Sequence, residues 1–155
     1  MTGLDLEDLY SGRILELSAN MPRTGRLISP HATATAHSKL CGSVITVDLC
    51  MENGLVTDYA QDVQACLLGQ TSAAVMGAQI VGSTADELRE VGTIMRRMLK
   101  QGGPPPGGRW ADLAVLELVR DYKARHASTL LVFDAVEDAL RQIEARTAVA
   151  AKSGA

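Results

Sequence analysis

The sequence predicts an α+β fold, in which helices cover mainly one face of a short antiparallel sheet of three strands. A β-branched run at 44–51 is followed by the turn pair Asn53-Gly54 and by a second strand-like run at 55–63. This order indicates a β-hairpin, because an Asn-Gly pair readily adopts the positive φ angles of a tight turn. Most helix-like segments follow the hairpin. Strands early in the chain and helices late are typical of α+β folds.

The elements before the hairpin are one helix and one weak strand. Residues 5–19 carry apolar side chains at helical spacing. Pro22 and Pro30 flank a segment that we expect to be a surface loop. Residues 31–39 alternate small and polar side chains, which indicates a weak edge strand or an extended arm.

Four helices are expected after the hairpin. Residues 67–81 are rich in small and apolar side chains, which predicts a buried helix. Thr84 is placed to cap the next helix, with Glu87 reaching back to the free amide. The glycine- and proline-rich residues 102–108 end that helix. A short helix at 110–119 is expected, with Leu113, Leu116 and Val119 as its inner face. A long helix from His126 completes the prediction, and its apolar stripe consists of Leu130, Phe133, Val136, Leu140 and Ile143.

Length and charge limit the class of protein. A chain of 155 residues suits one compact domain, here 1–146, and the small residues of 147–155 predict a flexible tail. A net charge of −3 and 3% aromatic residues argue against nucleic acid as a partner. The acidic N-terminus does not resemble a signal peptide, and no apolar run approaches the ~20 residues of a membrane span. We expect a cytoplasmic protein with reduced thiols and no membrane partner.

Two cysteines stand at the same end of the predicted hairpin. Cys41 precedes the first strand, and Cys66 lies where the second strand meets a helix. Folding the hairpin should bring the two thiols together as a metal or cluster site. The positive end of the helix dipole favours the thiolate of Cys66, which makes it a candidate acceptor of persulfide sulfur. His126 opens the last helix, where neutral imidazole, the form that binds metal, is favoured.

Five short motifs occur in a fixed order along the chain. They are Tyr10 with residues 19–23, Cys41-Gly42-Ser43, the turn at 53–58, Ala65-Cys66, and residues 125–130. In this order the chain resembles the U-type iron-sulfur cluster scaffolds, meaning IscU, SufU and the amino-terminal domain of NifU, from about residue 10 to 143. The insertion at 91–110 is similar in layout to SufU, whereas His126 is similar to IscU.

Two positions depart from the family pattern. Ser43 stands where the family has the aspartate of its Cys-Gly-Asp motif, and Ala127 stands where it has the third cysteine. Serine is a poor metal ligand and alanine is none. The usual site with three thiols therefore cannot form from these positions.

The resemblance implies a SufE/NifU-like fold and a role as an iron-sulfur cluster assembly scaffold or sulfur acceptor, and not as an enzyme of ordinary turnover. It implies iron or a labile [2Fe-2S] cluster on Cys41, Cys66 and His126, with a further ligand from Cys50, a second subunit or an exogenous thiol. Cysteine desulfurase would supply sulfur, and apo-proteins or a carrier would receive the cluster.

Two alternatives remain open from the residues. Two thiolates and an imidazole also suit zinc, so the chain could be a zinc-dependent, SufU-like sulfurtransferase that relays persulfide. A degenerate family member that binds partners without metal is the second alternative. The sequence leaves the oligomeric state open, including a homo-oligomer. Cys50 lies within an apolar run and is expected to be packed in or near the core.

Overall fold

The computed structural model describes residues 12–153. Tyr10 and the part of the predicted first helix before residue 12 lie outside these residues. The elements are α2 (Gly12–Ala19), β1 (Ala32–His37), β2 (Val44–Glu52), β3 (Leu55–Gln64), α3 (Leu67–Gln79), α4 (Ala85–Gln101), the 3-10 helices η1 (Gly108–Asp121) and η2 (Lys123–Arg125), and α5 (His126–Ser153).

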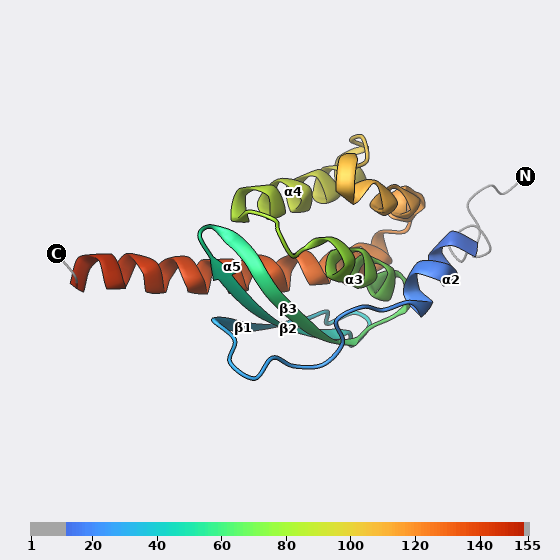
Figure 1. Cartoon of the computed structure of the whole chain (residues 1–155). Helices are drawn as coiled ribbons and strands as arrows, with labels where there is room; N and C mark the ends of the chain where they lie inside the picture. Colours follow the sequence, from blue (N-terminus) through green and yellow to red (C-terminus); the bar gives the residue numbers. More distant parts are fainter. Residues whose placement is uncertain (1–11, 154–155) are drawn as a thin grey trace, which may run out of the picture.

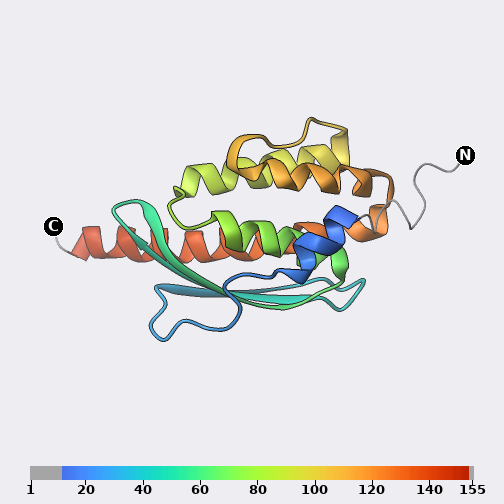
Figure 2. The ribbon, with the colours of Figure 1, turned by 45° about the vertical axis from the view of Figure 1, so that its right-hand side comes forward.

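The three strands form one antiparallel sheet in the order β1-β2-β3, which confirms the predicted fold class. The long helices lie on one face of this sheet (Figure 1). α5 contacts β1 and β2, and α3 contacts β3. In the rotated view, α3 in green and α5 in red lie next to the sheet, while α4 and η1 form an outer layer (Figure 2).

The predicted hairpin is formed by β2 and β3. Asn53 and Gly54 have φ angles of 55° and 78°. Positive φ at both central residues is the geometry that an Asn-Gly turn supplies. The register pairs Val44 with Gln64. The residues just before β2 and just after β3 therefore lie at the same end of the hairpin.

The core lies between the sheet and the helices. Alternate side chains of β2 (Ile45, Val47, Leu49) are fully buried, as period-two alternation requires when one face of a sheet is covered. On α5, the predicted apolar stripe is buried at Leu130, Phe133, Val136 and Leu140, and Ile143 packs against its edge. Burial of this apolar surface is the main stabilising contribution to the fold.

The opposite face of the sheet holds a buried carboxylate, Asp48. Arg26 donates to both of its oxygens, at 2.7 and 3.1 Å, and the Leu27 amide and the Thr33 hydroxyl donate at 2.9 and 2.6 Å. Burial would raise the pKa of Asp48, but these hydrogen bonds outweigh burial and lower it below its ordinary value. The segment between the flanking prolines, expected as a surface loop, is thus fixed across the sheet by this ion pair.

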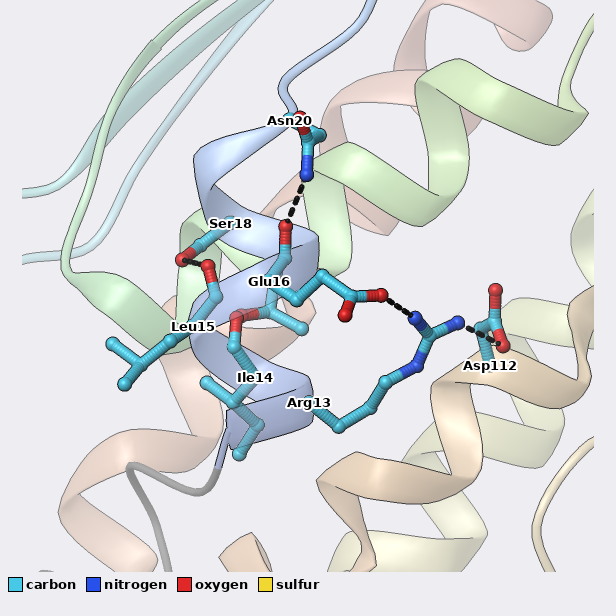
Figure 3. A network of polar contacts seen from close by, with 8 residues as sticks. Arg13, Ile14, Leu15, Glu16, Ser18, Asn20 and Asp112 are labelled. Atoms are coloured by element: carbon cyan, nitrogen blue, oxygen red, sulfur yellow. Dashed lines mark hydrogen bonds and ion pairs between the residues drawn. The ribbon is translucent and has the colours of Figure 1, made fainter.

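α2 is attached to the outer layer at one end of the molecule. Arg13 reaches both Glu16 on its own helix and Asp112 on η1, 2.9 Å away, while Ile14 is fully buried beneath (Figure 3). The side chain of Asn20 donates to the carbonyl of Glu16 at 2.8 Å, past the end of the helix.

The segment predicted as a short helix at 110–119 is a 3-10 helix. Its buried side chains recur at every third position, namely Trp110, Leu113, Leu116 and Val119. A 3-10 helix has three residues per turn, so this spacing gives one straight apolar face. The inner face is thus as predicted from the sequence, but the helix type differs from the prediction.

At the start of α4, the predicted cap by Thr84 is formed, but the predicted return contact from Glu87 is not. The Thr84 hydroxyl caps the helix by accepting from the Glu87 amide at 3.1 Å. The Glu87 carboxylate does not reach back to the cap, because it accepts from the indole N–H of Trp110 at 2.9 Å. It therefore joins α4 to η1.

The C-terminal helix extends further than expected. α5 continues to Ser153 and includes most of the predicted tail. The division into a domain at 1–146 and a flexible tail at 147–155 stays a prediction. Within residues 12–153, none of the helices has the length and apolar character needed to span a membrane.

Candidate functional site

Cys41 lies in the short connection between β1 and β2. The Ser38 amide donates to the Ser43 carbonyl at 2.8 Å, and the Gly42 amide donates to the Ser38 carbonyl at 2.9 Å. Gly42 has a φ of 71°, a conformation that glycine adopts without strain. This tight loop buries Ser38 and Ser43 and leaves Cys41 exposed.

Cys66 is the N-cap residue of α3 and is half-buried. Its backbone is extended, so the chain turns from β3 into the helix at this residue. One turn further, Gly69 faces α5: a Cβ added there would lie 3.0 Å from the Ser128 carbonyl oxygen. Glycine at position 69 therefore allows the first turns of α3 and α5 to approach each other closely.

Ser128, in the first turn of α5, contacts Cys66. Its Oγ atom lies 3.3 Å from Sγ of Cys66, and the same hydroxyl also acts on the Cys41 thiol. Ser128 itself is 1% exposed and donates to the Arg125 carbonyl at 3.2 Å. The register of β2 and β3 places Cys41 and Cys66 at one end of the hairpin, as predicted, and their joint role as a metal or cluster site stays a prediction.

The Cys41 thiol is surrounded by hydroxyl groups. Its Sγ lies 3.4 Å from Oγ of Ser38 and 2.9 Å from Oγ of Ser43. Hydrogen bonds from Ser38 and Ser43, with a further one from Ser128, lower the pKa of Cys41 from 9.0 to about 7. A substantial fraction of this exposed thiol is therefore thiolate at neutral pH, the form that attacks sulfur and binds metal.

His126 is the first residue of α5, as predicted, but its side chain hydrogen-bonds to the end of η1. Its Nε2 atom lies 3.1 Å from the Val119 carbonyl oxygen and 3.0 Å from that of Arg120. Both neighbours are acceptors, so Nε2 carries a proton and donates. In the neutral ring the lone pair is then on Nδ1, and a metal would have to bind there.

Cys50, considered as a further ligand, and Asp48 of the same strand are engaged elsewhere. Cys50 lies further along β2 and is half-buried, and its thiol donates to the Ser29 carbonyl oxygen at 3.5 Å. It alternates with the core residues Ile45, Val47 and Leu49, so it lies on the face of the sheet opposite the core and not in or near the core as expected. Asp48 is occupied by Arg26. Within the part of the chain that the structure describes, His, Cys, Asp and Glu side chains do not form a group of three or more that could hold a metal ion. The site thus consists of two thiols in a ring of serine hydroxyls.

Comparison with solved structures decides the family. The amino-terminal part of a nitrogen-fixing NifU-like protein from Brucella abortus superposes with a TM-score of 0.88 at 59% sequence identity, over 90% of this chain and 96% of that one. The chain belongs to the U-type iron-sulfur cluster scaffold family. No family model matches the sequence.

Two further relatives of this scaffold family are more distant. The iron-sulfur cluster assembly scaffold protein IscU of Thermotoga maritima is 24% identical over 135 residues, covering 87% of this chain and 94% of IscU. An iron-sulfur cluster assembly scaffold protein for the SUF system from Fervidobacterium islandicum has a TM-score of 0.77 at 22% identity, over 88% of this chain and 99% of that one. At 22% identity, the Fervidobacterium structure shows similarity of fold alone.

Sequence reasoning missed the serines of this scaffold. Ser43 was considered only as a lost ligand, and Ser38 and Ser128 received no role. The spacing held a signal for two of them, because Ser38 and Ser43 flank Cys41 within one short loop. Ser128 comes from α5, 62 residues beyond Cys66, and only the packing of α3 on α5 identifies it.

Proposed function

We propose that this scaffold binds iron or a labile [2Fe-2S] cluster through Cys41 and Cys66. The observation that supports it is that the hairpin places both cysteines at the same end, where Oγ of Ser128 lies 3.3 Å from Sγ of Cys66 and Cys41 is exposed. Thiolates are the ligands that iron-sulfur clusters use. A site with only two protein thiols binds weakly, which is compatible with passing a cluster to a recipient apo-protein or a carrier.

Cys41 has the properties expected of a sulfur acceptor. The donor would be the persulfide of a cysteine desulfurase. The Cys41 thiolate attacks the outer sulfur of that persulfide, the S–S bond breaks, and the desulfurase cysteine leaves as a thiolate. Cys41 then carries the persulfide, with no net oxidation. The sequence predicted this role for Cys66, which remains the alternative acceptor.

The surface beside Cys41 suits a protein partner. Leu40 is 76% exposed next to the thiol. An exposed leucine at a reactive residue can be buried by a docking protein and add apolar contact area. We therefore expect the desulfurase to dock over this loop.

His126 stays a prediction as a third ligand. Coordination through Nδ1 would keep its hydrogen bonds to η1, since only Nε2 is used there. A His126→Ala variant that loads as much iron as the wild type would remove it from the ligand set.

Anaerobic reconstitution tests the proposal. Wild-type protein incubated with ferrous iron and sulfide should show the visible absorbance of a cluster, and Cys41→Ser and Cys66→Ser should lose it. Cys50→Ser is the matched control, because its thiol is remote from the pair, and should keep the absorbance. Zinc without colour in freshly purified protein would instead support the sulfurtransferase that relays persulfide.

A second candidate function is the binding of partner proteins without metal, as a degenerate member of the family. It is favoured by one observation, the absence of a three-ligand group among the described residues. Desulfurase binding that is unchanged in Cys41→Ser and Cys66→Ser, together with no iron or zinc in any preparation, would support this function over the first.

A further inference from the structure

β1 forms one edge of the sheet, with β2 on its inner side. The other edge strand, β3, is covered by its own chain near both of its ends. The Gly25 amide donates to the Gln61 carbonyl at 2.9 Å, and the Val56 amide donates to the Ser83 carbonyl at 2.9 Å. The two edges of the sheet therefore differ in how much of their backbone is available to another molecule.

The register shows which backbone groups of β1 face outward. The Ser38 amide donates to the Ser43 carbonyl at 2.8 Å, which continues the register that places His37 opposite Val44. In an antiparallel pair, hydrogen-bonded and non-hydrogen-bonded residues alternate along the strand. The amides and carbonyls of Thr33, Thr35 and His37 therefore point away from β2.

Two side-chain contacts agree with this assignment. The Oγ1 atoms of Thr35 and Thr46 lie 2.9 Å apart, as expected from the close approach of side chains in a non-hydrogen-bonded pair. The side chain of Gln142 on α5 donates to the Thr33 carbonyl at 2.9 Å, which satisfies one outward-facing acceptor. Among the residues that the structure describes, no other hydrogen bond reaches the outward-facing backbone groups of β1. The half of the strand with Thr35 and His37, whose side chains are exposed, is thus open.

β1 lacks the features that keep an edge strand from pairing with another chain. Its sequence, ATATAH, contains no proline and no Asp, Glu, Lys or Arg. Its pairing with β2 has no bulge. Charged residues, prolines and bulges are the usual protection of exposed edges. Lys39, the first charged residue after the strand, lies beyond its end. An extended chain can therefore add to this edge.

We propose that the edge of β1 pairs with the same edge of a second copy of the chain, in antiparallel direction, so that the two sheets become continuous. Thr35 of each copy then lies opposite His37 of the other, and Ala36 lies at the twofold axis. Each outward-facing amide meets an outward-facing carbonyl, because identical antiparallel strands are related by a twofold axis. The strand has no acidic or basic residue that would repel its own copy, which favours a second copy as the occupant.

The dimer should be weak and should depend on protein concentration. Each hydrogen bond contributes little net free energy, and the loss of translational and rotational freedom on association opposes it. Pairing through one short strand also buries less than the roughly 1,600 Å² of a standard interface. We therefore expect dissociation in roughly the micromolar to millimolar range. The inference goes beyond the proposed function and does not depend on a metal at the thiols.

Thr35→Pro tests the inference, because it removes the outward-facing amide. Proline is tolerated in edge strands where the amide faces solvent, so circular dichroism should show an unchanged fold. Sedimentation equilibrium should show self-association of the wild type, weakened about tenfold or more in Thr35→Pro. Thr35→Ala is the matched control. It loses the hydroxyl contact with Thr46 but keeps the amide, and should dimerise as the wild type does.

Thr35→Lys and amide exchange keep the test decisive if the proline variant does not fold. Thr35→Lys keeps the amide but places like charges near each other across the interface, so it should also weaken the dimer. In the wild type, hydrogen exchange at the amides of Thr35 and His37 should slow as protein concentration rises. A wild type that stays monomeric into the millimolar range, or equal self-association of all variants, overturns the inference. Protection of these amides that appears only when another protein is added also overturns the second copy as the occupant.

Discussion

The Oγ atom of Ser128 lies 3.3 Å from the Sγ atom of Cys66. The same hydroxyl helps to lower the pKa of Cys41, so one side chain of α5 acts on the thiols from both ends of the hairpin. Ser128 directly follows Ala127, which replaces the third cysteine of the family. A hydroxyl stabilises thiolates by hydrogen bonding but is a poor metal ligand. The hydrogen bonds around Cys41 therefore favour a reactive thiolate at that residue, while the serines add no strong metal ligand.

Alkylation of Cys41 should depend on pH with a midpoint near 7. The thiolate is the nucleophile, and hydrogen bonds from Ser38 and Ser43 lower the pKa of Cys41 from 9.0 to about 7. The rate in metal-free protein should rise between pH 6 and 8 and then level off, as followed by mass spectrometry with iodoacetamide.

The serine variants provide the control for this pH profile. Ser38→Ala and Ser43→Ala each remove a hydrogen bond to the thiolate, so each should move the midpoint upward. Thr147→Ala, on the C-terminal half of α5, should leave it unchanged. A midpoint near 9 in the wild type would contradict the role of the hydroxyl groups.

The fold could be predicted because its determinants are local. Asn53-Gly54 specified the turn, alternation specified the burial of β2, and the stripe of α5 specified its inner face. The helix type of η1 was missed because an apolar residue at every third position was interpreted as an α-helical face. The role of Asp48 was missed because its partner Arg26 lies 22 residues away on a segment without regular structure.

The candidate site could be predicted only in part, because some of its contacts join elements that are distant in sequence. The hairpin register alone places Cys41 and Cys66 at one end, and the spacing of the motifs contains that information. The direction of the His126 side chain depends on where the end of η1 packs, and no pattern in the sequence specifies it. Contacts between elements distant in sequence, such as that of Ser128 with Cys66, require the tertiary structure.

Gly69→Ala should destabilise the protein although alanine is the better helix former. The added Cβ would lie 2.9 Å from Cβ of Ala65 and 3.0 Å from the Ser128 carbonyl oxygen. Helix propensity contributes about 1 kcal/mol in favour of alanine, and overpacking costs about 1 to 3 kcal/mol. A net loss of about 1 kcal/mol should be measurable by urea unfolding. Iron loading should also fall, because α3 and Cys66 move away from α5.

Gly12→Ala is the matched control for this substitution. Gly12 is also helical, and an added Cβ would meet nothing within 4 Å. Its stability should be unchanged or slightly higher. Equal stability of the two variants would show that a side chain at position 69 does not prevent the close packing of α3 on α5.

Asp48→Asn should lower stability at pH 7 by about 1 to 3 kcal/mol, because a buried charge-assisted network loses its charge. The folded protein holds the pKa of Asp48 below its ordinary value. The unfolded chain therefore binds the proton first as the pH falls. The stabilisation is present above about pH 4 and is lost as the pH drops through the folded pKa. Urea unfolding from pH 7 to 3 should show the two proteins converging at acid pH. Asp138→Asn, whose carboxylate is 46% exposed, should cost under about 0.5 kcal/mol at every pH.

Ala127→Cys should strengthen cluster binding. Ala127 is exposed, so a cysteine there causes no overpacking, and it directly precedes Ser128, whose Oγ lies 3.3 Å from Sγ of Cys66. A third protein thiolate should lengthen the lifetime of the reconstituted cluster about tenfold or more, since even an outer-shell partner changes metal affinity tenfold or more. The lifetime is measured as the decay of visible absorbance in the presence of a chelator.

Ala127→Ser separates ligation from simple filling of space, because it is close in size but is a poor ligand. It should behave as the wild type. If Ala127→Cys has the lifetime of the wild type, position 127 does not face the metal. Since the first turn of α5 is fixed to η1 through His126, the missing ligand would then have to come from another side of the thiol pair, such as a second subunit across the exposed loop of Cys41.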